Sequence, residues 1–351
     1  MILALMLALS AAADPAPREV RVYGDWAVGC DNRRKCHATS LPDETASDEP
    51  VGDGNLDVSI KRDGARISEL KVQLAFTTKI PGVDFDSVRW IAIDDSRLDL
   101  RLSGKDGVYD LNPADSAKLV AAMRGKSKLA LLDRRRNEVG AASLRGLPQA
   151  LGYMDHQQFL DGTIAALARP GLKAVNHFTV PPMLPAPVVR VAPQPQRPPR
   201  TLDAQELARL QESDPCPRSA SEEPRAPPSY FRLDERSSLV MIASRCGGYN
   251  PTTVLFILRE NGSVRLPRFW HPDGGEKLYD ADLPDLWWDS KARKLNSFGR
   301  GRVLADCGEI QEYAWDGDRF ELTHSASMPV CRGSRDYITT YRAEIRLMDG
   351  P

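Results

Sequence analysis

The chain has 351 residues, of which 42% are hydrophobic and 27% are charged. This composition is typical of a soluble globular protein and excludes a disordered or fibrous one, and the length is sufficient for two or three domains. The formal net charge is −1, so the overall charge does not favour nucleic acid or an anionic membrane as a partner.

The first segment, residues 1–13, is an apolar run that ends in three alanines. It is shorter than the ~20 apolar residues that span a bilayer. A short apolar core followed by small residues is typical of a secretory signal peptide, here with cleavage after Ala13. A buried N-terminal helix is the alternative, but the following Asp14-Pro15 pair breaks a helix. The sequence therefore predicts an exported, periplasmic protein with no membrane-spanning segment.

The first half of the mature chain, residues 14–179, is predicted to be a mostly antiparallel β unit. Short runs of alternating or β-branched residues are separated there by turn residues such as Asp63-Gly64. The expected strands are 20–29, 56–60, 67–76, 88–93, 98–102, 129–132 and 139–144.

Two helices are expected within this unit. Asn112 can cap the first, Pro113 suits its first turn, and Gly125 can end it. The second begins near Pro148, where apolar residues recur at helical spacing.

The middle segment, residues 180–200, contains eight prolines and no acidic residue. Proline fixes φ and removes a backbone donor, so we expect that this run neither continues a helix nor lies inside a sheet. It should form a semi-rigid, extended linker that reaches up to ~65 Å. The linker separates residues 14–179 from residues 201–351, and the sequence leaves the relative orientation of these halves open.

The second half, residues 201–351, begins with a capping box, Asp203 and Glu206, for a short helix. Strands should follow, with Asn261-Gly262 and Asp316-Gly317 as hairpin turns. They are expected at 239–244, 252–259, 263–269, 286–289, 295–298, 310–315 and 319–323. A meander, a sandwich and a partial propeller all remain open. The predicted fold class is thus mainly β with a few helices, in two antiparallel β units joined by a proline-rich linker.

The cysteines agree with export, because an even number in an exported chain indicates a disulfide framework. The six are Cys30, Cys36, Cys216, Cys246, Cys307 and Cys331. We expect Cys30 to pair with Cys36, and for the other four we favour the nearest pairs, Cys216–Cys246 and Cys307–Cys331, although other pairings are open. No C-x-x-C or H-x-x-x-H spacing occurs, so no metal site is predicted.

Several short motifs resemble one bacterial envelope family, catalogued as domain of unknown function 1176. The first half is also similar to invasion-associated locus B proteins. The motifs are Tyr-Gly-Asp-Trp-x-Val-x-Cys-Asp-Asn with Arg-Lys-Cys at 23–36, Ala-Leu-Gly-Tyr-Met-Asp at 150–155, Gly-Arg-Gly-Arg at 299–302, Asp-Cys-Gly at 306–308 and Cys-Arg-Gly at 331–333. The resemblance implies a periplasmic, disulfide-bonded protein, and it implies no reaction.

The sequence indicates no catalytic centre. A nucleophile elbow, a P-loop, a dinucleotide fingerprint and an H-E-x-x-H motif are all missing. Ser116 with Lys118 has the spacing of a dyad, but such a pair on an amphipathic helix is usually a surface pair. We therefore predict no catalytic residue and no cofactor, and we favour a protein that is not an enzyme.

The most informative stretch for binding is 269–289, where six carboxylates and one lysine are interleaved with aromatic residues. This composition suits a glycan-stacking groove or a calcium loop. The competing interpretation is that the tryptophans fill the sheet core while the carboxylates are solvated. The candidate ligand-binding residues are Trp270, Asp273, Glu276, Tyr279, Trp287 and Trp288.

These observations favour an exported, monomeric, non-catalytic binding or envelope-maintenance protein. A cell-wall glycan or another envelope protein would be its partner. One alternative is a cell-wall or glycan hydrolase that uses a carboxylate pair from 269–289, and such a pair should lie ~5–10 Å apart. A second alternative is an inhibitor or partner of another envelope protein.

Overall fold

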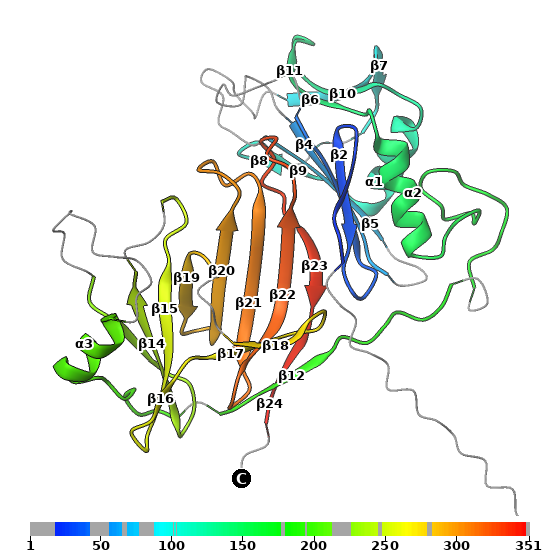
Figure 1. Ribbon diagram of the computed structural model, residues 1–351. Helices are drawn as coiled ribbons and strands as arrows, with labels where there is room; N and C mark the ends of the chain where they lie inside the picture. The colour runs from blue at the N-terminus through cyan, green and yellow to red at the C-terminus, as the bar shows by residue number, and fades with distance from the viewer. Residues whose placement is uncertain are drawn as a thin grey trace, which may run out of the picture.

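The protein is described by a computed structural model, which places residues 18–42, 56–64, 69–76, 88–100, 102, 104–176, 180–193, 195–212, 226–244, 248–278 and 283–348. In these ranges the chain forms 24 strands and three helices, which confirms a mainly β fold with a few helices (Figure 1). None of these helices is long and apolar enough to cross a membrane.

The first half contains two antiparallel sheets. The larger has the strand order β1-β2-β3-β4-β5-β9-β8, and the smaller has the order β11-β10-β6-β7. The larger sheet comprises β1 (Arg21–Tyr23), β2 (Trp26–Cys30), β3 (Cys36–Ser40), β4 (Leu56–Arg62), β5 (Leu70–Phe76), β8 (Gly104–Lys105) and β9 (Val108–Asp110). The smaller comprises β6 (Val88–Ile93), β7 (Ser96–Leu98), β10 (Lys128–Asp133) and β11 (Glu138–Ser143).

Both helices expected in this half are present, α1 (Pro113–Met123) and α2 (Leu147–Gln157). The Asn112 side chain caps α1 by accepting from the Asp115 backbone N–H at 2.9 Å. Apolar residues of the two helices and of both sheets form one core. This core holds the first half together.

The second half packs two further sheets face to face. One has the order β13-β14-β15-β16, and the other has the order β18-β17-β22-β21-β20-β19, with β23 added beside β22. The first comprises β13 (Ser229–Arg232), β14 (Ser237–Ala243), β15 (Thr253–Arg259) and β16 (Val264–Arg265). The second comprises β17 (Arg268–His271), β18 (Gly275–Leu278), β19 (Leu286–Asp289), β20 (Lys294–Arg300), β21 (Gly308–Trp315), β22 (Phe320–Met328) and β23 (Ile338–Arg342). Side chains of both sheets share one core, as in a sandwich.

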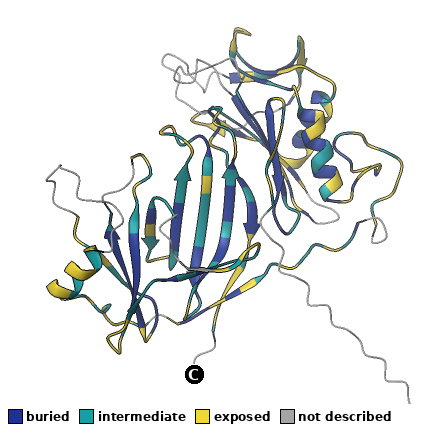
Figure 2. Ribbon diagram, in the orientation of Figure 1, coloured by how far each residue is buried: buried dark blue, intermediate teal, exposed yellow. Residues whose placement is uncertain are grey.

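The other face of the β13–β16 sheet is covered by α3 (Ala204–Glu212), which shows a largely exposed outer surface in Figure 2. The predicted capping box is present: the Glu206 N–H donates to Asp203 at 2.8 Å, and the Asp203 N–H donates to Glu206 at 3.1 Å. Leu207 and Leu210 of the helix pack on this face of the sheet. β14 and β15 are therefore buried on both sides.

The proline-rich segment differs from the expectation. Residues Val188–Val191 form strand β12, which pairs in parallel with β24 (Glu344–Leu347) near the C-terminal end. The expectation that this run lies in no sheet was wrong, because five consecutive residues between Pro187 and Pro193 keep their backbone donors. In a two-stranded sheet each strand forms backbone hydrogen bonds along only one of its two edges, so prolines that flank the paired residues are tolerated. Independent folding of the two halves stays a prediction.

Three expected strands have clearly different bounds in the structure. The strand expected at 20–29 is divided by the turn at Gly24-Asp25 into β1 and β2, which pair antiparallel. The run 263–269 is divided into β16 and β17 at Pro267, which has no backbone donor. The strand expected at 98–102 is β7, which begins directly after the tight turn at Asp94-Asp95 and ends at Leu98. The predicted β6–β7 and β15–β16 hairpins are nevertheless present.

The two halves touch along β2 and β23, which lie side by side in Figure 1. Gly29 makes this approach possible, because a Cβ added there would lie 2.9 Å from Cγ2 of Ile338. Ala27 and Leu41 of the first half share a small buried cluster with Met328 and Ile338 of the second. The linker therefore joins two halves that also pack against each other.

Candidate functional site

Two of the three expected disulfides are present, Cys30–Cys36 and Cys307–Cys331. Cys216 and Cys246 lie outside the described residues, as does the predicted signal peptide.

The contact between the halves, called here the interface, is built around buried carboxylates. Asp25 lies in the turn after β1 and is 2% exposed. It accepts from Arg145 of its own half and from Arg332 of the other half, each at 2.8 Å. Burial alone would raise the pKa of Asp25, but the hydrogen bonds from these two guanidinium groups hold it well below its usual value. Asp25 is therefore a fixed negative charge.

The loop closed by the Cys30–Cys36 disulfide presents a second contact to β23. Asn32 Nδ2 donates to the backbone oxygen of Arg342, and the Arg342 N–H donates back to Asn32 Oδ1, both at 2.9 Å. Asp31, which is fully buried, accepts from Arg342 Nε at 2.8 Å. Side chains of the disulfide loop thus bind Arg342 of β23, in the second half.

A serine, a histidine and an aspartate meet further along the interface. His37 Nε2 lies 2.9 Å from Ser59 Oγ and 2.8 Å from Asp336 Oδ2. A catalytic triad needs the serine on one ring nitrogen and the carboxylate on the other. Here both partners lie on the same ring nitrogen, Nε2. His37 therefore cannot pass a proton from the serine as a triad histidine does, and its role is to link Ser59 to Asp336 through buried hydrogen bonds.

Asp57 is the neighbouring buried carboxylate of the interface. Ser334 Oγ donates to its Oδ2 at 3.1 Å, whereas its Oδ1 has no hydrogen-bond partner among the described residues. Burial and the nearby Asp336 carboxylate raise the pKa of Asp57 to about 7. Asp57 can therefore change its charge near neutral pH.

These contacts explain what the sequence motifs do. Asp25, Asp31 and Asn32 come from the motif at 23–36, and Arg332 comes from the motif at 331–333. They meet across the interface, so residues of these two motifs join the halves.

The candidate binding residues at 269–289 are divided by the structure. Trp270 and Glu276 are direct partners across the β17–β18 hairpin, and Asp273 is exposed in its turn. Trp288 is half-buried and packs against the core, with its ring 6.0 Å from that of Phe231. The other positions are Trp287, 45% exposed on β19 at the far edge of the sheet, and Tyr279, outside the described residues.

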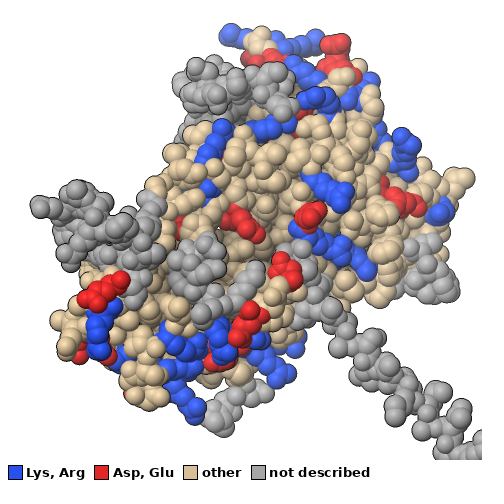
Figure 3. Space-filling view, viewed as in Figure 1, with Lys and Arg blue, Asp and Glu red and all other residues tan. Residues whose placement is uncertain are grey.

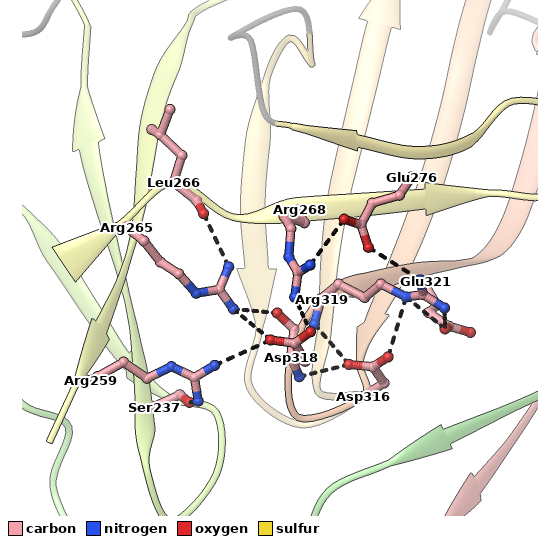
Figure 4. Close-up of polar contacts among 10 residues, drawn as sticks. All are labelled: Ser237, Arg259, Arg265, Leu266, Arg268, Glu276, Asp316, Asp318, Arg319 and Glu321. Carbon is pink, nitrogen blue, oxygen red and sulfur yellow. Dashed lines mark hydrogen bonds and ion pairs between the residues drawn. The ribbon is translucent and has the colours of Figure 1, made fainter. Parts of the chain in front are cut away.

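Glu276 belongs to a group of charged side chains, called here the arginine–carboxylate cluster (Figure 4). Trp270 lies beside this cluster, against Arg319. The members of the cluster are Arg259, Arg265, Arg268, Arg319, Glu276, Asp316, Asp318 and Glu321. The cluster lies where β15, β16 and β17 meet the β21–β22 turn. On the face seen in Figure 3, basic and acidic surfaces lie side by side over the lower part of the second half.

Asp318 is the centre of the cluster. It pairs with Arg259 at 3.5 Å, with Arg265 at 3.3 Å and with Arg268. Its side chain is nevertheless 57% exposed. The turn that carries it is fixed by Asp316 Oδ1, which accepts from the backbone N–H of Asp318 at 2.7 Å.

Arg319 links the cluster to the predicted residues. It pairs with Glu276 at 3.3 Å and with Glu321 at 2.8 Å, and its guanidinium carbon lies 5.7 Å from the centre of the Trp270 ring. Burial alone would lower the pKa of Arg319, but these carboxylates raise it above its usual value. The site thus offers fixed guanidinium donors, carboxylate acceptors and an indole ring at a partly exposed surface.

Sequence reasoning missed the arginines of this cluster. Three of them come from different strands, β15, β16 and β17, and Arg319 comes from the β21–β22 turn, so no spacing in the sequence connects them. The sequence pattern that could have pointed to the cluster is the Asp316-Gly317 turn followed by Asp318 and Arg319.

The other described carboxylates of 269–289 are largely engaged. Both oxygens of Glu276 pair with guanidinium groups, from Arg268 at 3.0 Å and from Arg319. Asp285 pairs with Arg300 at 2.5 Å, and Asp289 accepts from two backbone N–H groups of its turn. Asp280 and Asp282 lie outside the described residues.

One group has the composition of a metal site, namely Asp306 with Cys307 and Cys331. The two sulfur atoms are bonded to each other, so neither is a thiolate that could bind a metal. Asp306 accepts from Arg302 and from the Gly333 N–H. This group is a structural junction.

Comparison with known proteins agrees with the motifs. The model of the family "Protein of unknown function (DUF1176)" matches residues 20–344, which confirms the resemblance. The uncharacterized protein YpfG of Escherichia coli is 25% identical over 326 residues, which cover 89% of this chain and 88% of YpfG. The crystal structure of invasion associated protein B from Bartonella henselae is similar at 15% identity and a TM-score of 0.27, over 40% of this chain and 98% of that one.

Proposed function

Since the chain belongs to the DUF1176 family, whose description names no function, we propose a role from the structure: an exported, non-catalytic binding protein of the cell envelope. Two disulfides are compatible with export. A cell-wall glycan is the ligand class that we favour.

The arginine–carboxylate cluster beside Trp270 carries this proposal. Glycans are recognised by flat aromatic rings together with planar, multivalent hydrogen-bonding groups, which arginine and carboxylate side chains supply. Here Glu276 on β18 and Arg319 in the β21–β22 turn pair with each other beside the indole, on a partly exposed surface. Such preorganisation lowers the cost of binding, because the groups are ordered before the ligand arrives.

The test is a thermal shift measurement on the mature chain with pooled soluble cell-wall glycans, and separately with calcium. A binding glycan should raise the melting temperature by several degrees at about 100 times its Kd. Trp270→Ala should abolish this shift. The matched control is Trp287→Ala, an exposed tryptophan at the opposite edge of the sheet, which should keep it.

Two results would overturn the proposal. One is a melting temperature that no glycan changes, and the other is a glycan shift that survives Trp270→Ala. Trp288→Ala is unsuitable, because this side chain packs against the core.

The hydrolase alternative is less well supported. It requires a carboxylic acid free to protonate a leaving group, whereas Glu276 has both oxygens engaged by guanidinium groups. Mass spectrometry of the same glycans after incubation separates the two functions, because a binding protein leaves their masses unchanged. A pull-down from envelope extracts tests the remaining alternative of a protein partner.

A further inference from the structure

The first half contains an open cavity between α1 and the loop that follows α2. Its volume is about 540 Å³, within the range of roughly 300–1,000 Å³ that is usual for small-molecule sites. Eleven of the thirteen described residues that line it are apolar, and the other two are Arg62 and Arg124. No carboxylate is among them. The cavity thus combines an apolar interior with positive charge.

The loop wall of the cavity is held by a buried ion pair. Arg62 and Asp155 pair at 2.8 Å, with side chains 4% and 2% exposed. Asp155 also accepts from the N–H groups of Leu167 and Ala168 at 2.9 Å, and Arg62 donates to the backbone oxygen of Ala165 at 3.1 Å. These bonds fix the loop backbone without a ligand, so the cavity is preformed.

The apolar wall remains partly open to solvent. Ile164 lines the cavity and is 64% exposed, whereas Val120 of α1 forms a buried part of it. An alkyl chain laid against these side chains would remove apolar surface from water, which is favourable in proportion to the area covered.

Arg124 supplies the cation of the cavity. It follows the last turn of α1 and is half-buried, and its Nε donates to the backbone oxygen of Leu167 at 2.7 Å. Among the residues that the structure describes, none accepts from either of its Nη atoms. Its position is therefore fixed while two donor nitrogens remain for an anion.

We propose that this cavity binds a single-chain amphipathic anion, with the alkyl chain against Val120, Leu160 and Ile164 and a carboxylate or phosphate head at Arg124. This goes beyond the proposed glycan-binding role, because the cavity lies in the other half of the chain. Failure of either proposal leaves the other standing.

Isothermal titration calorimetry on the mature, full chain tests the proposal with four probes. Decanoate and decyl phosphate distinguish a carboxylate from a phosphate head, decyltrimethylammonium reverses the charge, and 1-octanol removes it. We expect at least one of the two anions to bind, and the cation to bind at least tenfold more weakly.

Variants on α1 separate the apolar part from the charge. Ala117→Phe fills the cavity from an exposed position and should abolish binding of every probe. Arg124→Gln should weaken the anions about tenfold and leave 1-octanol unchanged. The control is Lys118→Gln, which removes a charge from the same helix at a side chain that is 66% exposed and outside the cavity.

Three results would overturn the proposal: no binding of either anion at millimolar concentration, normal binding by Ala117→Phe, or equal weakening by Lys118→Gln and Arg124→Gln. Circular dichroism melting of each variant shows whether it is folded. A binding loss in a variant that melts as the wild type does supports the cavity.

Discussion

The interface and the arginine–carboxylate cluster are built from the same residue types but differ in burial. Asp25 of the interface has a side chain that is 3% exposed and two arginine partners. Asp318 of the cluster has three arginine partners, yet its side chain is 57% exposed. The number of ion pairs therefore does not distinguish the two regions.

Burial decides what each region can do. Removing one partner of a buried pair leaves an uncompensated charge and costs about 3–5 kcal/mol. An exposed pair contributes only about 0–1 kcal/mol. The interface can therefore fix the arrangement of the halves, whereas the cluster can exchange its internal pairs for a ligand at low cost.

The largest effect that this comparison predicts is at Arg332. Arg332→Met removes the donor to Asp25 and to the backbone oxygens of Gly24 and Pro42. We expect the free energy of unfolding to fall by about 3 kcal/mol, because a buried carboxylate and two backbone oxygens lose a donor. Guanidinium chloride unfolding measures this change.

The matched control is Arg335→Met in the same loop. Arg335 is exposed and donates to one backbone oxygen, that of Leu304. Its replacement should change stability by less than about 0.5 kcal/mol. Equal effects of the two substitutions would remove the distinction between the regions.

A smaller, pH-dependent effect is expected at Asp57. Its pKa is raised from 3.8 to about 7 in the folded protein, so folding favours the protonated form and stability falls as pH rises from about 4 through 7. Asp57→Asn cannot titrate. The stability of the variant relative to the wild type should therefore rise by roughly 2.5 kcal/mol from pH 5 to pH 8.

Unfolding of both proteins at several pH values checks this, since all other titrating groups are shared. A stability difference that stays constant with pH would show that Asp57 is already ionised in the folded protein.

The smallest effect on stability is expected at Asp318. Asp318→Asn removes the central charge of the cluster, but at an exposed site where screening by water limits each pair to about 1 kcal/mol or less. Thermal unfolding should therefore be almost unchanged. A loss above about 2 kcal/mol would place the cluster among the structural elements and weaken its assignment as a contact surface.

Much of the local structure could be predicted from short-range chemistry. Asn112 and Pro113 located α1, and the Asp203–Glu206 box located α3, because capping depends on neighbours within one turn. The hairpins could be predicted from their turn residues for the same reason. Strand β12 was missed, because its pairing with β24 depends on a segment over 150 residues away.

The candidate site could be predicted only in part. Trp270 and Glu276 were found because they lie in one short hairpin. Trp287 and Trp288 are adjacent in sequence, but their side chains alternate across a strand, so one is exposed and the other joins the core.

The sequence by itself determined the helix caps, the hairpin turns and the near-neighbour disulfides that the structure describes, because each depends on residues close together in the chain. Only the tertiary structure decided which charged side chains are buried. Asp25 and Asp31 resemble many surface aspartates in sequence, and their partners Arg332 and Arg342 lie 307 and 311 residues away. Desolvation arises when such distant segments pack together, and it is desolvation that makes the interface structural and leaves the cluster accessible.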